Sequence, residues 1–129
     1  MKTILIPTDF SKNAYQALFY ATQLFKNYQC HFILLNTFSV NTPVLTSRLN
    51  PSKGGELYKK LSVESDAKLT EVYHKIVRDT DGLDHSFETV SISQPLTETI
   101  EKTIRSKDID LIVMGTKGAT GAKEFFFRQ

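Results

Sequence analysis

The sequence predicts an α/β protein built on an open, doubly wound parallel sheet with helices on both faces. Short apolar runs alternate along the chain with longer segments of helical spacing, in the order strand, helix, strand, helix, strand, helix, strand. This alternation is typical of parallel strands joined by right-handed crossovers. With 129 residues the chain has the size of one domain, so we expect residues 1–129 to form a single domain.

The first strand and helix follow from local patterns. Residues 2–7, KTILIP, are a short apolar run that ends at a proline, which suits a buried strand. Ser11 is a good N-cap for the helix that comes next. The apolar residues of this helix recur at helical spacing and form one face: Ala14, Ala17, Leu18, Ala21, Leu24, Phe25 and Tyr28.

The middle of the chain predicts a strand, a long loop and a long helix. Residues 30–35 are a continuous apolar run, which favours a strand that is covered on both faces. Residues 38–55 are rich in Ser, Thr, Asn, Pro and Gly and are expected to form a loop, long enough to indicate a lid or a mobile segment. Helical spacing then continues from Glu56 to about Arg78.

The last third predicts two more strands and one helix. Asp81 and Gly82 indicate a turn. Residues 85–92 alternate in polarity, which favours a strand with one wetter face at an edge of the sheet. Pro95 can open the third helix, and residues 110–115 form the fourth and most apolar strand.

The composition excludes some classes of partner. Because 16 basic and 14 acidic residues leave a formal charge of +2, we expect neither a nucleic acid nor an anionic membrane as a partner. No stretch approaches the roughly 20 apolar residues of a membrane-spanning helix, and the apolar start of the chain is too short for a signal peptide. The only cysteine, Cys30, suits a buried thiol in a reducing compartment. We therefore expect a cytoplasmic protein.

Candidate ligand-binding residues follow the predicted strands, because open parallel sheets bind ligands beyond the carboxyl ends of their strands. Thr8 and Asp9 follow the first strand, Asn36 and Thr37 follow the second, and Gly115 and Gly118 follow the fourth. Asp9 can accept hydrogen bonds from a ligand amine or hydroxyl, or it can belong to the entry of the next helix. The two glycines can let backbone N–H groups approach a phosphate, or they can simply form a turn.

The sequence shows no catalytic constellation. It lacks the Gly-Lys-Ser/Thr ending of a Walker A motif, and it lacks a G-x-G-x-x-G motif after the first strand. His31, His74 and His85 lack the spacing of metal ligands, and His31 is expected to be a hydrogen-bonded core residue of its strand. No nucleophile with a general base stands out. We therefore expect a binding protein with no enzymatic activity, no catalytic residues and no metal site.

Three blocks, KTILIPTDFSKNAYQAL, ILLNTF and DIDLIVMGTKG, make the whole chain resemble the universal stress protein family. The resemblance implies a Rossmann-like three-layer sandwich of the adenine-nucleotide alpha-hydrolase type, in which the family sheet has the strand order 3-2-1-4-5. It also implies a role in stress survival, often without a clear enzymatic reaction. Many members bind ATP, others do not, and most are dimers.

The resemblance implies a cofactor-binding set that comprises Pro7, Thr8, Asp9, Thr37, Met114, Gly115 and Gly118. Asp9 matches the aspartate that meets the adenine ring. Thr37 matches the position whose backbone meets adenine, where the family usually has valine. Gly115 and Gly118 match the first two glycines of the family's phosphate signature.

The end of the sequence departs from that signature. Arg128 and Gln129 stand where the family has a glycine and a serine or threonine, so binding of ATP, with Mg, is expected to be weakened or incomplete. The family's last helix and fifth strand are expected to be missing, which leaves the order 3-2-1-4 in an apparently truncated domain. The alternatives to a nucleotide-binding stress protein are a dimeric interaction module that binds no nucleotide and a fragment of a longer tandem stress protein.

The same departure predicts self-association. A missing helix and strand would leave the edge of the fourth strand and an apolar surface uncovered. We therefore expect a homodimer or a larger assembly that pairs through the fourth-strand edge and the segment from Phe125 to Phe127.

Overall fold

The computed structural model describes residues 1–38, 51–93, 96–115 and 123–127, with the backbone alone for residues 51–54, 96–97 and 123–127. Its elements follow one another as β1 (Lys2–Pro7), α1 (Lys12–Leu24), β2 (Cys30–Thr37), α3 (Pro51–Asp79), β3 (His85–Ile92), α4 (Leu96–Lys107), β4 (Leu111–Gly115) and β5 (Lys123–Phe127).

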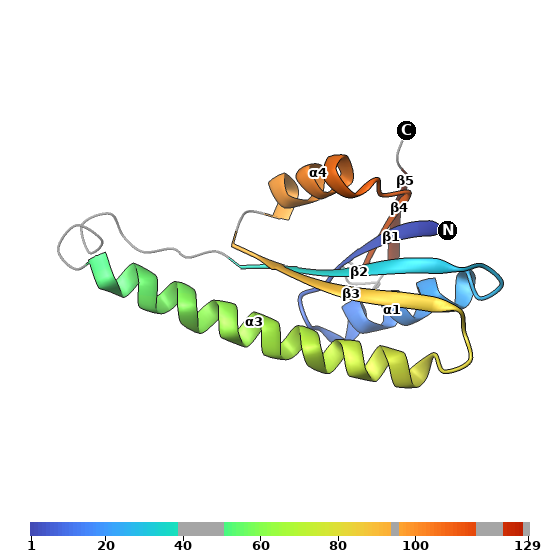
Figure 1. Ribbon diagram of the computed structural model, residues 1–129, viewed down its shortest axis with the longest axis horizontal. Helices are drawn as coiled ribbons and strands as arrows, with labels where there is room; N and C mark the ends of the chain where they lie inside the picture. The colour runs from blue at the N-terminus through green and yellow to red at the C-terminus, as the bar shows by residue number, and fades with distance from the viewer. Residues whose placement is uncertain (39–50, 94–95, 116–122, 128–129) are drawn as a thin grey trace.

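The strands form one sheet in the order β3-β2-β1-β4-β5. β1 pairs in parallel with both β2 and β4, and β2 pairs in parallel with β3. The predicted parallel sheet with the order 3-2-1-4 is therefore confirmed. Figure 1 shows the layers of the doubly wound fold: α1 and α3 lie on one face of the sheet, and α4 lies on the other.

The expectation that no fifth strand is present was wrong. β5 pairs with β4 in the antiparallel direction, from Leu111 opposite Phe127 to Gly115 opposite Lys123. The segment from Phe125 to Phe127 therefore pairs with the β4 edge within the same chain, so that edge is not free. An antiparallel neighbour needs only a short connection, whereas a parallel strand needs a crossover of a dozen or more residues.

Two element boundaries differ from the predicted ones. α3 begins at Pro51 rather than at Glu56, because proline is well tolerated in the first turn of a helix and the glycines at positions 54 and 55 each cost a helix only about 1 kcal/mol. β2 continues to Thr37, since its pairing with β3 extends as far as Thr37 opposite Ile92. The expected lid at residues 38–55 is described only in part: residues 51–55 belong to α3, whereas residues 39–50 and the helix start at Pro95 lie outside the described residues.

Other local predictions are confirmed. β1 and β3 have the predicted bounds, and β3 lies at an edge of the sheet. Ser11 caps α1, because its side-chain oxygen accepts a hydrogen bond from the Ala14 N–H at 3.1 Å. Gly82 forms the turn before β3 with a φ of 91°. However, Leu24 and Tyr28 are 50% and 58% exposed, and α1 ends at Leu24, so that Tyr28 lies beyond the helix.

Apolar clusters lie on both faces of the sheet. The cluster under α1 and α3 comprises Ile4, Ile6, Ala17, Leu18, Ala21, Cys30, Phe32, Leu34, Leu69, Ile76, Leu111 and Val113. The cluster on the α4 face comprises Leu5, Ile33, Leu35, Ile109 and Ile112. β1 and β2 supply both clusters because successive side chains of a strand point to opposite faces. The continuous apolar runs of the sequence therefore reflect burial on two sides.

Cys30 and His31 are adjacent residues of β2, and their side chains are buried to different extents. Cys30 is fully buried, as predicted, and its burial raises the pKa of the thiol. His31 has partners, as predicted: its ring nitrogens lie 2.7 Å from Ser86 Oγ and 2.8 Å from Glu88 Oε1. It is only half-buried, and its partner Glu88 also lies near the end of α4, with Lys107 Nζ 3.6 Å from Glu88 Oε2.

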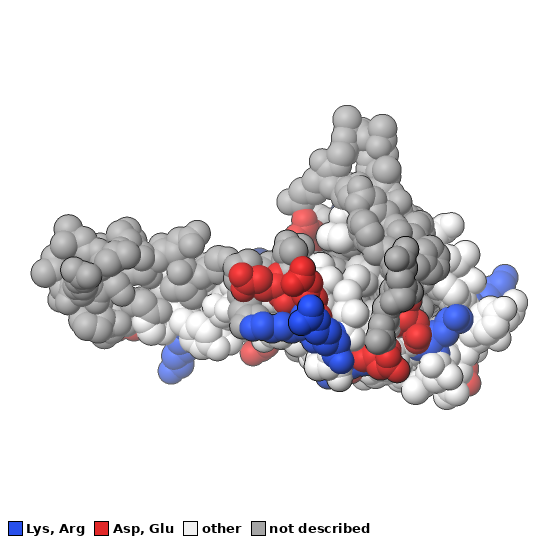
Figure 2. Space-filling model, turned by 90° about the horizontal axis from the view of Figure 1, so that it is seen from above, with Lys and Arg blue, Asp and Glu red and all other residues white. Residues whose placement is uncertain are grey.

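The described surface carries mixed charge. Figure 2 shows acidic and basic side chains next to one another on the face seen there, without a continuous area of one sign among the residues that are described. Within the described ranges, no helix is both long enough and apolar enough to span a bilayer.

Candidate functional site

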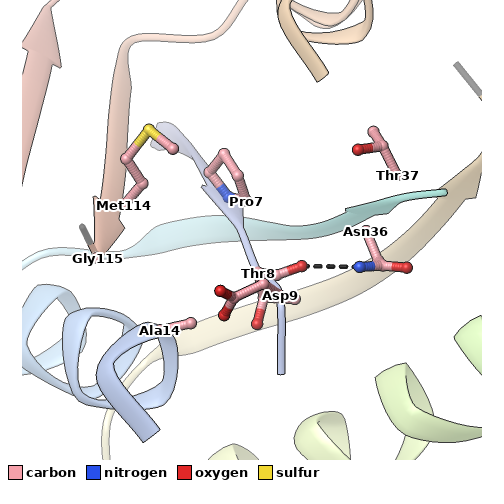
Figure 3. Close-up of a pocket in the computed structure, with 8 residues that line it drawn as sticks. All are labelled: Pro7, Thr8, Asp9, Ala14, Asn36, Thr37, Met114 and Gly115. Carbon is pink, nitrogen blue, oxygen red and sulfur yellow. Dashed lines mark hydrogen bonds between the residues drawn. The ribbon is translucent and has the colours of Figure 1, made fainter. Parts of the chain in front are cut away.

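A cavity of about 160 Å³ opens at the carboxyl ends of β1, β2 and β4, next to the first turn of α1 (Figure 3). It lies where the chain leaves the central strand β1 in one direction for β2 and reaches β4 on the other side. This is the position at which open α/β sheets bind ligands. The residues that line it are Pro7, Thr8, Asp9, Ala14, Asn36, Thr37, Met114 and Gly115.

The structure brings most of the predicted binding residues to this cavity. All of the predicted set line it except Gly118, which lies outside the described residues. Ala14 and Asn36 also line it, although the sequence did not place them in the set. Ala14 was hidden in the apolar face of α1. Asn36 was among the residues noted after the second predicted strand, but it was not included in the binding set.

The loop from Thr8 to Ser11 is held by short-range hydrogen bonds. The Thr8 hydroxyl oxygen accepts from the Phe10 N–H at 3.1 Å, and Asp9 Oδ1 accepts from the Ser11 N–H at 2.9 Å. Phe10 has a φ of 66°, an uncommon conformation for a bulky residue that these bonds help to hold. Lys68 Nζ of α3 lies 5.6 Å from the centre of the Phe10 ring.

Asp9 has the first of the two roles that the sequence left open, at the helix entry, and its ligand-binding role stays a prediction. It shapes the entry to α1, since one of its oxygens accepts the Ser11 N–H. It is also exposed and lines the cavity (Figure 3). A carboxylate has two oxygens with about four acceptor sites, so it can accept more than one hydrogen bond.

Both backbone polar groups of Thr8 are bonded to β2. Its N–H donates to the Leu35 carbonyl at 2.8 Å, and its carbonyl accepts from Asn36 Nδ2 at 2.8 Å. Pro7, the last residue of β1, has no N–H to donate. The bonds to Thr8 therefore hold the chain beside β2 for one residue beyond the strand.

Gly115 permits a close approach of β4 to α1. A Cβ atom at this position would lie 2.7 Å from the Asn13 carbonyl oxygen and 3.2 Å from the Ala14 nitrogen, both of which belong to the helix backbone. Contacts this short to backbone atoms leave no room for a side chain. Gly115 is thus required by packing at the edge of the cavity, a reason different from the turn that its sequence context suggested.

The described residues hold no group of three or more His, Cys, Asp or Glu side chains placed to bind a metal ion. The polar groups of the cavity are instead one carboxylate, one carboxamide and two threonines, on Asp9, Asn36, Thr8 and Thr37. Side chains of these types can donate or accept hydrogen bonds.

Comparisons with known proteins agree with this architecture. The sequence profile described as "Universal stress protein family" matches residues 1–129. A comparison with curated proteins finds no match.

Solved structures with the same fold extend over most of the chain. The hypothetical protein MJ0577 is similar with a TM-score of 0.72 and 25% identity, over 94% of this chain and 78% of that one. Universal stress protein UspA from Lactobacillus plantarum has a TM-score of 0.67 and 22% identity, over 92% and 79% of the two chains. A universal stress protein in complex with cAMP has a TM-score of 0.51 and 18% identity, over 88% and 75%.

Proposed function

Because the chain belongs to the universal stress protein family, we propose that it is a cytoplasmic stress-response protein that binds an adenine nucleotide in the cavity beside β1, β2 and β4. The observation that carries the proposal is the convergence of Pro7, Thr8, Asp9, Thr37, Met114 and Gly115 on one cavity. A second observation supports the ligand class, since one universal stress protein of this fold was solved in complex with cAMP.

The size of the cavity favours the base as the part of the nucleotide that it encloses. Pockets for complete small-molecule ligands usually measure roughly 300–1,000 Å³. The described cavity of about 160 Å³ is smaller and has apolar walls at Pro7 and Met114. We place the adenine ring between these walls, with its exocyclic amine donating to Asp9.

The phosphate part is proposed to contribute little affinity. Arg128 and Gln129 occupy the positions of the family's glycine and hydroxyl residue, and both lie outside the described part of the chain. We therefore expect ATP with Mg to bind no more tightly than AMP. Calorimetric titration of both nucleotides tests this expectation, and a sub-micromolar Kd for ATP with much weaker AMP binding would contradict it.

Base recognition is tested with AMP and IMP, which differ at the group that is proposed to meet Asp9. IMP carries a carbonyl oxygen there, which a carboxylate repels. We expect AMP to bind about tenfold more tightly than IMP, since a hydrogen bond to a charged group contributes roughly 1.5–3 kcal/mol.

The Asp9→Asn variant should lose most of this preference. Its side-chain oxygen can still accept the Ser11 N–H, so the entry to α1 is kept, while its amide can donate to the IMP carbonyl. Asp84→Asn, an exposed aspartate at the opposite end of the sheet, is the matched control. Equal binding of AMP and IMP by the natural protein, or an unchanged preference in Asp9→Asn, would overturn the proposed base contact.

We also propose that the site binds its ligand without turnover. This proposal rests on the absence of a nucleophile and general-base pattern in the sequence. The test is an assay of phosphate release from ATP over many hours. Release that Asp9→Ala abolishes would show that the protein is an enzyme.

A homodimer is proposed as the assembly. The edge available at the β4 end of the sheet is now the outer edge of β5, so association at this end would extend the sheet from β5. Light scattering at micromolar concentration should give the mass of a dimer or a larger assembly. A sharp monomer peak would contradict the proposal.

A second candidate function is an interaction module that binds no nucleotide. It is favoured by the outer face of α1, where Phe19 and Tyr20 are 38% and 42% exposed and line a hollow of about 310 Å³. This candidate predicts an intact assembly without a thermal shift for any nucleotide. A thermal shift with AMP but not with inorganic phosphate would exclude it.

A further inference from the structure

A chain of side-chain hydrogen bonds runs from β3 through α3 and β2 to the loop of the cavity. Ser91 Oγ lies 2.7 Å from Ser65 Oγ, Ser65 Oγ lies 2.8 Å from Asn36 Oδ1, and Asn36 Nδ2 lies 2.8 Å from the Thr8 carbonyl oxygen. Four segments that are far apart in the sequence thus meet through three consecutive bonds. We refer to Ser91, Ser65 and Asn36 as the relay.

Chemistry fixes the direction of every bond in the relay. A carbonyl oxygen can only accept, so Asn36 must turn its Nδ2 toward Thr8, as Figure 3 shows. Its Oδ1 is then an acceptor, which requires the Ser65 hydroxyl to donate. The Ser65 oxygen is left to accept from Ser91. The orientation of the Asn36 amide is therefore set by its neighbours on both sides.

The bond between Ser65 and Asn36 is buried, whereas Ser91 is only partly buried. Asn36 is 9% exposed and Ser65 is 4% exposed. An acceptor or donor that is left without a partner in such a place is costly, and a fully connected network holds its members in one arrangement. Loss of the Ser65 hydroxyl therefore leaves Asn36 Oδ1 without its donor, and a change in the orientation of the Asn36 amide alters its bond to the Thr8 carbonyl.

The bond to Thr8 lies at the point where the loop of the cavity starts. Asp9 follows directly, and the unusual backbone of Phe10 comes one residue later. Since Asn36 itself lines the cavity, the relay ends at the wall of the site.

We propose that Asn36 is the positioning residue of the cavity and that the relay transmits the position of α3 to the loop that carries Asp9. Movement of α3 relative to β2 and β3 would then change how Asp9 is presented to a ligand. The ligand part of this inference rests on the proposed nucleotide function, whereas the control of the loop does not.

Three substitutions interrupt the relay at different points. Asn36→Asp replaces the donor to the Thr8 carbonyl by an acceptor. Ser65→Ala removes the donor to Asn36 Oδ1. Ser65→Thr keeps a hydroxyl at this position and should therefore preserve both the order of the loop and the binding of AMP. Thr70→Ala is the matched control, because Thr70 lies on the same helix and its hydroxyl bonds only to the Asp66 carbonyl of its own turn, at 2.8 Å.

Two measurements on the full chain report on the loop. The first is amide hydrogen exchange at Phe10 and Ser11, and the second is the Kd for AMP. We expect Asn36→Asp and Ser65→Ala each to speed exchange at both amides and to raise the Kd about tenfold. Ser65→Thr and Thr70→Ala should leave both measurements within twofold of the natural protein.

The double variant Ser65→Ala/Asn36→Asp separates a relay from two independent effects. Residues that act in one network are not additive. The double variant should therefore bind AMP no more weakly than Asn36→Asp alone. Additive losses, or unchanged exchange at Phe10 and Ser11 in the single variants, would overturn the relay.

The two proposals fail in different ways. If the natural protein binds no AMP, the proposed function fails, and hydrogen exchange still decides whether the relay holds the loop. Should Asn36→Asp not fold, Ser65→Ala, Ser65→Thr and the exchange measurement decide the question. Unchanged loop exchange in a folded Ser65→Ala protein counts against the relay.

Discussion

At the scale of single residues, the site depends on contacts that leave little freedom. Gly115 has room for no side chain, because the backbone of α1 occupies the space where a Cβ would lie. Thr8 is held through both of its backbone groups. Asp9 uses one oxygen for the fold and lines the cavity. Asp9 thus contributes both to the start of α1 and to the wall of the cavity.

The Gly115→Ala substitution tests this close approach. We expect it to destabilise the protein by about 1–3 kcal/mol, since either β4 or α1 must shift to admit a methyl group. Gly55→Ala is the matched control, because no atom lies within 4 Å of its Cβ position and alanine favours a helix by up to about 1 kcal/mol. Chemical denaturation measures both. A Gly115→Ala protein as stable as the natural one would show that the contact can relax without cost.

At the scale of elements, a charged cluster connects α4 to the sheet. Glu88 of β3 contacts His31 of β2 and Lys107 at the end of α4. On the opposite face, the Tyr15 hydroxyl of α1 donates to Asp79 at the end of α3, and Lys75 Nζ lies 4.1 Å from the centre of the Tyr15 ring. Helices on both faces are therefore connected through polar contacts as well as apolar packing.

The cluster around Glu88 predicts a dependence of stability on pH. The hydrogen bond from His31, and then the charge of Lys107, lower the pKa of Glu88 below its ordinary value of 4.5. A carboxylate with a lowered pKa stabilises the fold above that ordinary value, and this contribution is lost as the pH falls through the pKa of the folded state.

We therefore expect Glu88→Gln to be less stable than the natural protein at pH 6 and to approach it at pH 3. Thermal unfolding at several pH values measures the difference. Glu101→Gln, an exposed glutamate on α4, should follow the natural protein at every pH. A difference between Glu88→Gln and the natural protein that stays constant from pH 6 to pH 3 would contradict the assignment.

The elements also show what the sequence can predict and why the rest was missed. β1, β3 and the cap at Ser11 were predicted because each depends on a local pattern. β5 was not, since KEFFF becomes a strand only by pairing with β4, and the direction of that pairing is a tertiary property. The start of α3 was missed because Pro51 suits both a loop and the first turn of a helix.

For the candidate site, too, one part could be predicted from the sequence and another part could not. Its backbone positions were predictable, because the carboxyl ends of parallel strands must meet at one end of the sheet. The role of Asn36 was not predictable, since its partner Ser65 is 29 residues away on a helix. The crowding at Gly115 likewise exists only once α1 and β4 are packed together.

At the scale of the whole molecule, the two faces of the sheet are covered unequally. Two helices, α1 and α3, pack on one face, whereas α4 is the one described helix on the other (Figure 1). The described core under α1 and α3 is accordingly the larger of the two clusters. The β1 and β2 strands lie between them and contribute to both.

Two neighbouring leucines of β2 test this asymmetry. Leu34 and Leu35 are both fully buried but belong to the clusters on opposite faces. Leu34→Ala and Leu35→Ala should each cost roughly 2–5 kcal/mol, with the larger loss for Leu34, because two packed helices limit the collapse of the cavity. Urea denaturation provides the comparison. An equal or greater loss for Leu35→Ala would show that the α4 face is packed as rigidly as the other.

The reversed direction of β5 has a practical consequence for experiments. β5 starts with Lys123 next to Gly115, at the cavity, and ends with Phe127 next to Leu111, at the far end of β4. A fluorescent reporter or an affinity tag joined after β5 would therefore leave the sheet on the side remote from the cavity. A fifth strand in the parallel direction would have placed the same attachment beside the cavity.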